Sequence, residues 1–203
     1  AENFEPATAT ARRTILDAIA SDRSMLTEPE AKSVLTAYAI PVVETRVATD
    51  AGNAVQAAID LGFPVALKIL SPDISHKSDV GGVMLNLQTA DEVRSAAEAM
   101  QSRCAKLRPD AHLSGFTVQQ MIMRGGAHEL IVGCTTDAIF GPVILFGQGG
   151  TAVEAVADKA VALPPLNVPL ARDLVAQTRI AKLLAGYRDR PPADVDAIHL
   201  TLI

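Results

Sequence analysis

The chain has 203 residues, of which 49% are hydrophobic and 20% are charged. Such a chain can bury a substantial core, as one domain or as two small ones. Its net charge is −5, whereas nucleic-acid-binding proteins usually carry an excess of basic residues. No apolar run is long enough to cross a bilayer, and the N-terminus lacks the pattern of a secretory signal. The sequence therefore predicts no nucleic-acid partner and no membrane partner.

Aromatic residues contribute only 3% of the chain, and Trp is absent. The core must therefore rest on Ala, Val, Leu and Ile, as is common where helices cover parallel or mixed sheets. The two cysteines, Cys104 and Cys134, form no CxxC pair and no Cys/His array. They indicate neither a disulfide framework nor a zinc site, and we expect a reducing, cytoplasmic location.

The first secondary-structure signals are helical. Residues 10–22 carry apolar side chains at helical spacing, and we assign residues 1–24 to a connector with a leader helix. Thr27 and Glu30 have the spacing of a capping box, so the ordered domain is expected to begin near residue 25 with a second helix. Strands and helices then alternate, which predicts an α/β protein. Strands are expected at 42–47, 64–70, 83–87, 116–123, 128–136, 142–146 and around 161, and helices at 54–61 and 89–107 and from 151, 169 and 193.

Lys68 is the most informative single residue, because it lies within the apolar strand expected at 64–70. An unpaired ammonium group buried there would be costly. An anionic ligand would remove that cost, and the phosphates of a nucleoside triphosphate are the natural candidate. The alternative is a surface hairpin in which Lys68 extends its charge to solvent.

The loop at 71–82 follows this strand and is too polar to belong to a core. It offers several groups that bind phosphate, namely the side chains of His76, Lys77 and Ser78 and the backbone amides freed by Gly81 and Gly82. A loop histidine is most often a solvated side chain. Beside a phosphate site it can instead become a phosphohistidine or carry a proton. Spacing alone favours the solvated side chain for His76.

Two further segments could contact a nucleotide. Gln119, Gln120 and Met121 stand where a strand meets a Gly-Gly break, and an adenine could bind there between two subdomains. An ordinary interdomain turn explains the same pattern. Glu129 opens the next strand, where a carboxylate could hold ribose hydroxyls or magnesium, or could simply be solvated.

A glycine run at 147–150 precedes the helix expected from Thr151 and could cradle an anion. It matches neither the P-loop nor the dinucleotide fingerprint. Glu154 stands three residues after Thr151, so a capping box gives it a sufficient structural role.

Taken together, several stretches resemble the ATP-grasp domain of the NDP-forming acyl-CoA synthetases, the family that includes ADP-forming acetate–CoA ligase and its beta subunits. The most specific are the loop SPDISHKSDVGG and the block FGPVILFGQGGTAVEAVADKAVALPPL. The family usually has leucine where Gln148 stands. The resemblance extends over almost all of the chain after residue 25, in the stretches 26–41, 63–87, 118–121, 129–133, 140–142 and 146–166.

This resemblance implies an ATP-grasp fold of two α+β subdomains, at 25–123 and 124–203, with a nucleotide cleft between them. It implies an acid–CoA ligase that converts acyl-CoA, ADP and phosphate into acid, ATP and CoA. A separate CoA-binding half, on the same chain or another subunit, makes an acyl phosphate and a phosphohistidine. By position, Lys68 would neutralise nucleotide phosphates, Gly81 and Gly82 would cover them, and His76 matches a loop histidine proposed as a second phosphoryl carrier. Gln119, Gln120 and Met121 would line the adenine pocket.

The resemblance also implies magnesium. In the family its ligands lie in a segment resembling D-x-N-P-L, and this sequence reaches Ile203 without such a motif. We therefore expect a domain truncated at its C-terminus, with the magnesium ligands beyond residue 203. Because the metal neutralises the phosphates, such a fragment alone should be inactive.

Two other functions remain open from the sequence. One is a non-catalytic, synthetase-like regulatory module of a protein lysine acetyltransferase, in which Lys68 and His76 would persist in a ligand sensor. The other is a carboxylate–amine ligase of the wider ATP-grasp superfamily. That class fits the order of the subdomains but not the loop histidine.

Overall fold

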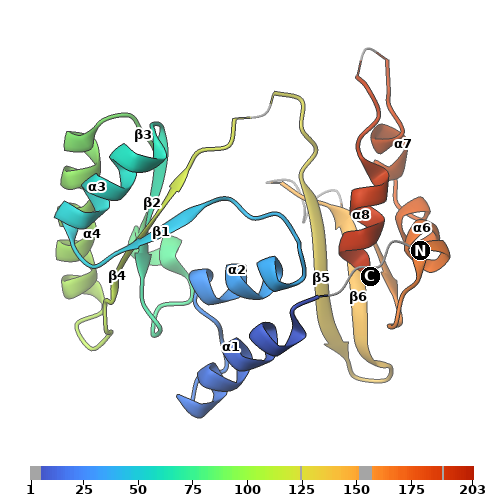
Figure 1. The fold of residues 1–203 in the computed structure, drawn as a ribbon, viewed down its shortest axis with the longest axis horizontal. Coiled ribbons are helices and arrows are strands. Elements are labelled where there is room, and N and C mark those ends of the chain that lie inside the picture. The colour runs from blue at the N-terminus through green and yellow to red at the C-terminus, as the bar shows by residue number, and fades with distance from the viewer. Residues whose placement is uncertain (1–5, 124, 151–156, 189) are drawn as a thin grey trace. The chain divides into compact units, whose positions relative to one another are not determined.

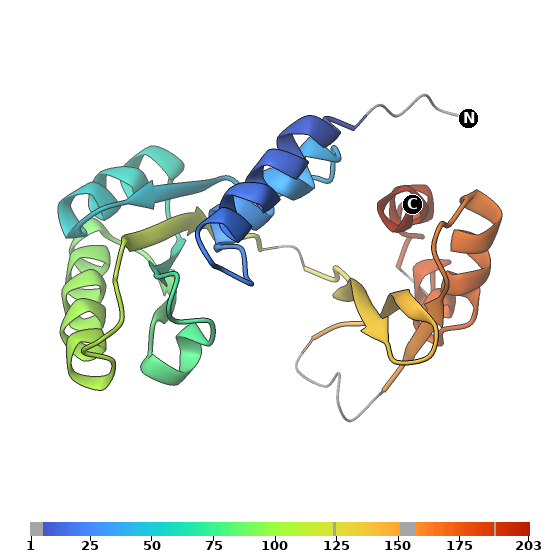
Figure 2. The same ribbon diagram turned by 90° about the horizontal axis from the view of Figure 1, so that it is seen from below.

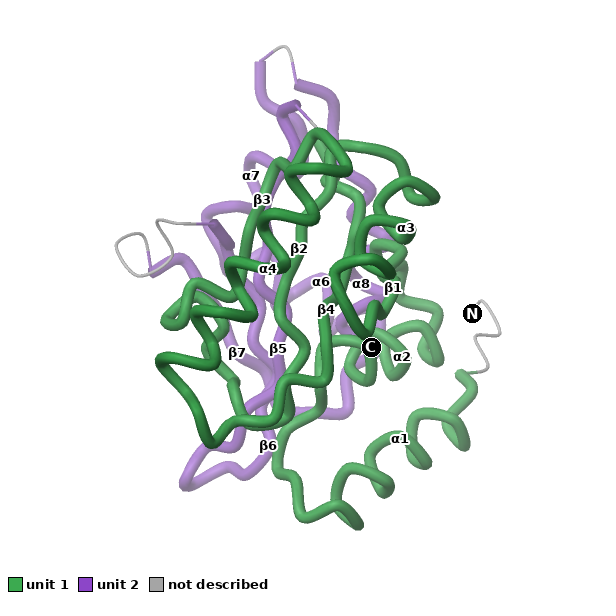
Figure 3. Tube along the Cα trace, turned by 90° about the vertical axis from the view of Figure 1, so that its left-hand side faces the viewer, with its two compact units in different colours: residues 1–123 green, residues 124–203 purple. Residues whose placement is uncertain are grey.

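A computed structural model of the chain describes residues 6–123, 125–150, 157–188 and 190–203. The chain divides into two compact units, Ala1–Met123 and Arg124–Ile203, which Figure 3 colours separately. Each unit has its own sheet and its own hydrophobic core.

The first unit is built on a four-stranded sheet in the order β1-β4-β2-β3 (Figure 1). All the strand pairs in this sheet are antiparallel. In chain order its elements are α1 (Thr8–Ala20), α2 (Glu28–Ala37), β1 (Thr45–Ala48), α3 (Ala51–Leu61), β2 (Val65–Leu70), the 3-10 helix η1 (Lys77–Val80), β3 (Val83–Leu87), α4 (Ala90–Leu107) and β4 (Gly115–Gln120).

The two faces of this sheet have different chemistry because side chains alternate along β2. Val65, Leu67 and Ile69 are fully buried in the core that the sheet forms with α3 and α4. Lys68 points to the opposite face, on the side of α2. Figures 1 and 2 show α3 and α4 on one side of the strands and α2 on the other. The sheet thus separates an apolar core from a polar face.

Helix α2 is fixed at its start by a local polar network. The Glu30 carboxylate accepts hydrogen bonds from the Thr27 backbone N–H at 2.7 Å and from the Thr27 hydroxyl at 2.8 Å. The two Nη atoms of Arg23 donate hydrogen bonds to the same carboxylate, at 2.8 and 2.7 Å. Helix α1 packs against α2 and buries Ala11 and Ala18. The compact unit therefore includes α1, which lies upstream of residue 25.

The second unit has a three-stranded antiparallel sheet in the order β5-β6-β7. Its core gathers Phe146, Leu174 and Leu184, each almost completely buried. The described elements are β5 (Leu130–Asp137), β6 (Gly141–Gln148), β7 (Lys159–Ala162), α6 (Val168–Ala176), α7 (Ile180–Leu184) and α8 (Val195–Leu202).

Most of the expected elements are confirmed, with instructive differences at some ends. The strand expected at 42–47 begins only at Thr45, where pairing with β4 starts, and the strand expected at 116–123 ends at Gln120. The described strand pairs are antiparallel, whereas the composition was typical of parallel or mixed sheets. Composition alone does not determine the direction of the strands. The helix expected from Thr151 and its Glu154 begin in the segment 151–156, which lies outside the described residues.

The helix expected from about residue 169 ends at Ala176, and a separate short helix, α7, follows it. The side chain at the N-cap position of α7, Arg179, makes no capping hydrogen bond. Instead the buried Asp158, far away in sequence, accepts hydrogen bonds from the backbone N–H groups of Arg179 and Ile180, each at 2.8 Å. Among the helices that the structure describes, none combines the length and apolar character needed to span a bilayer.

Candidate functional site

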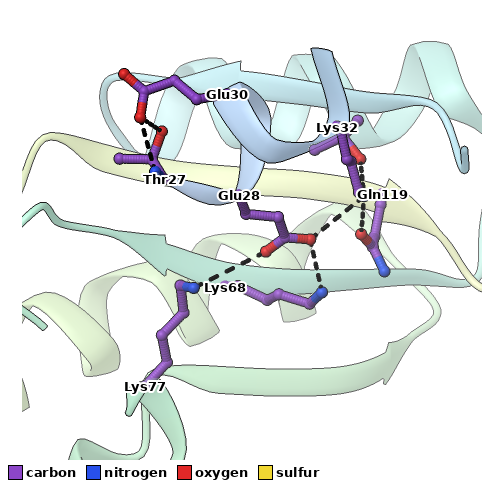
Figure 4. Close-up of polar contacts among 8 residues, drawn as sticks. Thr27, Glu28, Glu30, Lys32, Lys68, Lys77 and Gln119 are labelled. Atoms are coloured by element: carbon purple, nitrogen blue, oxygen red, sulfur yellow. Dashed lines mark hydrogen bonds and ion pairs between the residues drawn. The ribbon is translucent and has the colours of Figure 1, made fainter. Parts of the chain in front are cut away.

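The polar face of the first sheet holds a cluster of three lysines around one carboxylate (Figure 4). The ammonium group of Lys68 donates a 2.9 Å hydrogen bond to Oε1 of Glu28. Lys32 Nζ lies 3.3 Å from the same oxygen, and Lys77 Nζ lies 4.0 Å from Oε2. We call these four residues the lysine cluster. The anionic partner that Lys68 requires is thus supplied, in this conformation, by the protein itself.

The lysine cluster has an excess of positive charge, because one carboxylate faces three ammonium groups. Lys32 also donates to the side-chain oxygens of Gln119, at 2.8 Å, and Thr45, which are neutral acceptors. The four side chains of the cluster are only 16–22% exposed. An excess of cations in such a setting favours a multiply charged anion such as a phosphate.

Glu28 is ionised in this environment. Burial by itself would raise the pKa of its carboxyl group, but the hydrogen bond and charge of Lys68 and the charge of Lys32 outweigh that effect. The net result is a pKa below the usual value. Glu28 therefore acts as a resident anion on the lysines at neutral pH.

The loop at 71–82 is anchored at both ends and exposes His76 between its anchors. Ile74 and Val80 are buried in the core of the first unit, whereas the His76 side chain is exposed. The Asp73 carboxylate accepts a 2.6 Å hydrogen bond from the backbone N–H of His112, which fastens the loop to the segment after α4. The histidine is thus presented to solvent from a braced loop.

The backbone amides of the two glycines of this loop are hydrogen-bonded within the loop. The N–H of Gly81 donates to the carbonyl of Ser78 at 3.0 Å, and that of Gly82 donates to the carbonyl of Lys77 at 2.7 Å. Both amides are therefore used inside the loop in this conformation. Gly81 has a left-handed φ of 61°, and Gly82 packs against Ile69 so closely that a Cβ atom would lie 2.5 Å from that side chain. The Ser78 side chain is exposed.

The structure separates the three residues expected to line an adenine pocket. Gln119 faces Lys32 and joins the lysine cluster through its side-chain oxygen. Gln120 follows it on β4 and points to the opposite side, toward Gly62 at the end of α3. The backbone N–H of Met121 donates to the carbonyl of Pro64 at 2.9 Å, beyond the end of β4. Only Gln119 is brought to the lysines.

Glu129 and the glycine run lie together in the second unit. The carbonyl of Glu129 accepts a 2.7 Å hydrogen bond from the N–H of Gly149. A Cβ atom on Gly150 would lie 2.8 Å from the Glu129 carboxylate, and one on Gly147 would lie 2.3 Å from the carbonyl oxygen of Asp158. The exposed carboxylate therefore borders the glycine run, and Gly147 is required by the close approach of β6 to the segment before β7.

Glu28 and Lys32 were not expected from the sequence as members of the site. Both belong to a segment that the capping box already explained, and the i,i+4 spacing of a Glu and a Lys is common on solvated helices. The alternation of side chains along β2 predicts which face of the sheet Lys68 lies on. The sequence contains no signal that α2 covers that face. A cavity of about 80 Å³ also opens beside the Glu28 and Lys77 side chains, lined further by Thr27, Ser71 and Ser75.

Within the described residues, no group of three or more His, Cys, Asp and Glu side chains could hold a metal ion. Magnesium usually enters nucleotide sites through the phosphates, with only one or two carboxylates and several waters. The chemistry of the lysine cluster fits the phosphates that would carry such an ion.

The fold and this site define a nucleotide-binding protein of the ATP-grasp class, and comparison with known proteins identifies the family. The ATP-grasp domain family matches residues 17–203, so the chain belongs to it. The beta subunit of ADP-forming acetate–CoA ligase II from Pyrococcus furiosus is 38% identical over 188 residues, which cover 93% of this chain and 79% of that subunit. The resemblance to ADP-forming acyl-CoA synthetases is thereby confirmed.

Solved structures agree with this assignment. The dinucleotide-forming acetyl-coenzyme A synthetase 1 of Candidatus Korarchaeum cryptofilum, in complex with coenzyme A and Ca-AMPCP, is 39% identical with a TM-score of 0.86, covering 95% of this chain and 83% of that chain. A second structure of that enzyme contains coenzyme A and Mg-AMPPCP, with a phosphohistidine segment pointing towards the nucleotide-binding site. It is 37% identical with a TM-score of 0.77, covering 95% of this chain and 82% of that chain. These matches confirm the expected ATP-grasp fold.

Proposed function

We propose that this chain is the nucleotide-binding part of an ADP-forming acyl-CoA synthetase. It would pass a phosphoryl group from a phosphohistidine to ADP while acyl-CoA, ADP and phosphate become acid, ATP and CoA. The observation that carries this proposal is the excess of lysine over carboxylate on the polar face of the first sheet. The ligase and synthetase relatives support the same reaction. The alternative of a regulatory module gains no support from them.

In this reaction Lys68 and Lys77 donate hydrogen bonds to phosphate oxygens of the nucleotide. In the transfer to ADP the lysines act by positioning and charge neutralisation, because the transition state of phosphoryl transfer is loose and its charge is spread over the phosphate oxygens. A β-phosphate oxygen of ADP attacks the phosphorus of the phosphohistidine. The P–N bond breaks, its electron pair returns to the imidazole, and the new P–O bond completes ATP. Magnesium bound with the nucleotide supplies further neutralisation of the phosphate charge.

His76 is the proposed phosphoryl carrier on this chain. His76 is exposed and directly precedes Lys77, a member of the lysine cluster, in the sequence. The exposed Ser78 and the glycines Gly81 and Gly82 belong to the same loop, and we propose that this loop covers the phosphates. Gly82 can offer its amide to a phosphate oxygen only if its bond to Lys77 opens.

The remaining nucleotide contacts are also proposals. Gln119, Gln120 and Met121 are assigned to the adenine pocket, and Glu129 to the ribose hydroxyls. Residues 25–123 and 124–203 would form the two subdomains of the ATP-grasp domain, after a leader at 1–24. The phosphoryl group would come from a CoA-binding half that handles acyl-CoA and phosphate, on the same chain or on another subunit. A reducing cytoplasm suits the two free cysteines.

The test follows the phosphoryl group through the assembled enzyme. The chain is combined with its CoA-binding half and given acyl-CoA and radiolabelled phosphate, and the labelled protein is then chased with ADP. We expect label to reach ATP in the wild type and at least about 100-fold more slowly in His76→Ala. His112→Ala is the matched control, since the exposed His112 engages Asp73 through its backbone N–H. Transfer at the wild-type rate in His76→Ala would remove the carrier role.

A further inference from the structure

We propose that Glu28 is a resident competitor of phosphate, which occupies the lysine cluster when no nucleotide is bound and thereby lowers the affinity of the site for anions. The proposal rests on the function proposed above and assigns a further affinity-determining residue to that site. Glu28 would keep Lys68 paired in the empty site and make the nucleotide easier to release.

Glu28 projects from a fixed helix start. It is the first residue of α2, directly after the capping residue Thr27. The network of Arg23, Thr27 and Glu30 fixes that end of the helix. The carboxylate itself is held by Lys68 at 2.9 Å and by Lys32 at 3.3 Å. An incoming anion therefore meets a negative charge that is only 16% exposed.

The contacts of Glu28 with the lysines are unequal. The bond from Lys68 is short, at 2.9 Å, whereas Lys77 stands at 4.0 Å from the other carboxylate oxygen. A cavity of about 80 Å³ is lined by both Glu28 and Lys77. A phosphate oxygen can therefore displace Glu28 first from Lys77, where the contact is longest, and then compete with it for Lys68.

The charge of Glu28 also opposes a bound phosphate. A carboxylate within a few ångströms of a bound phosphate repels it, and this repulsion is weakly screened where both groups are partly buried. The three lysines still outnumber the carboxylate, so binding remains favourable but is moderated. Moderate affinity suits a site that must accept ADP and release ATP in each cycle.

The experiment measures anion binding directly, with inorganic pyrophosphate and the 203-residue chain. Glu28→Gln removes the charge and keeps an oxygen that can accept from Lys68. Glu98→Gln removes the same charge from an exposed position on α4 and is the matched control. The readout is the rise in Tm caused by pyrophosphate, because a ligand that binds only the folded state raises Tm as its Kd falls.

We expect pyrophosphate to bind Glu28→Gln at least about threefold more tightly than wild type, and Glu98→Gln like wild type. Adding Lys68→Met to Glu28→Gln should abolish the gain. A rise in Tm that is no larger in Glu28→Gln than in wild type, including no rise in either, overturns the proposal. If Glu28→Gln does not fold, Glu28→Asp withdraws the carboxylate by one methylene, and a rise no larger than that of wild type overturns the proposal equally.

A calorimetric titration with ADP separates this inference from the proposed function. Unchanged ADP affinity in Lys68→Met would contradict the proposed phosphate site. Unchanged pyrophosphate affinity in Glu28→Gln would contradict only the role of Glu28. The two failures are therefore read from different variants and different ligands.

Discussion

Lys68 of β2 and Glu28 of α2 are forty positions apart in sequence, and their charged groups meet at 2.9 Å on the polar face of the first sheet. Both side chains are mostly shielded from water, at 21% and 16% exposure. The pair therefore joins the start of α2 to the sheet. It has a structural role in addition to the proposed role in anion binding.

A double-mutant cycle should detect this pair. Lys68→Met, Glu28→Gln and the double variant are compared with wild type by denaturant unfolding. We expect a coupling free energy of about 1 kcal/mol, because a partly buried pair is screened less than an exposed one. The exposed pair Arg46 and Asp60, whose charged atoms are 2.6 Å apart, is the reference and should couple by less than about 0.5 kcal/mol. Equal coupling in the two pairs would show that burial contributes nothing.

Glu30 should make stability depend on acidity. Hydrogen bonds from Arg23 lower the pKa of this carboxyl from 4.5 to about 2, with further help from Thr27. A lowered folded-state pKa contributes stability that is fully present above pH 4.5 and is lost as the pH falls toward 2. Glu30→Gln should therefore lower the free energy of unfolding by about 1 kcal/mol at pH 7, and the difference should vanish near pH 2. A difference independent of pH would contradict this account.

Gly82 should not tolerate a side chain. A Cβ atom there would lie 2.5 Å from the Ile69 side chain and 3.0 Å from the Lys77 carbonyl oxygen. We expect Gly82→Ala to lower the free energy of unfolding by about 1–3 kcal/mol, because the buried strand and the loop cannot both keep their positions. Gly133→Ala on β5 is the control, since nothing lies within 4 Å of its Cβ position. Equal stability of the two variants, measured in denaturant, would rule out the clash.

Asp158 should hold the start of α7. Burial tends to raise the pKa of its carboxyl, but hydrogen bonds from the backbone N–H groups of Arg179 and Ile180 outweigh this and lower it. We expect Asp158→Ala to cost about 2 kcal/mol, because two backbone donors, one buried and one partly buried, lose their acceptor. Hydrogen exchange at the Arg179 and Ile180 amides should accelerate. Asp173→Ala, at an exposed position on α6, should leave that exchange unchanged.

The clearest successes of sequence-based prediction are elements whose signals are local. The helix expected at 54–61 is confirmed, although it begins at Ala51, directly after its N-cap Asp50. Asp50 accepts from the Asn53 N–H at 2.8 Å, and Gly62 ends the helix. The strand at Val83–Leu87 was expected with the same ends. Such signals are local because capping and side-chain alternation depend only on neighbouring residues.

The features that the sequence did not predict depend instead on residues that are distant in the chain. The start of β1 at Thr45 is set by its pairing with Gln119 on β4, and α7 begins where a distant carboxylate meets its amides. The side-chain contact of Gln119 likewise depends on a distant element, because its partner Lys32 lies on α2.

The family, the loop that carries His76 and the need of Lys68 for an anion could be inferred without the structure. They follow from motifs and from the cost of an unpaired buried charge, neither of which requires knowledge of distant contacts. The group that meets Lys68, the Glu28 carboxylate, became known only from the folded chain. The packing of α2 over the sheet brings Glu28 and Lys32 to Lys68, and packing between elements distant in sequence depends on how whole faces match rather than on any local pattern.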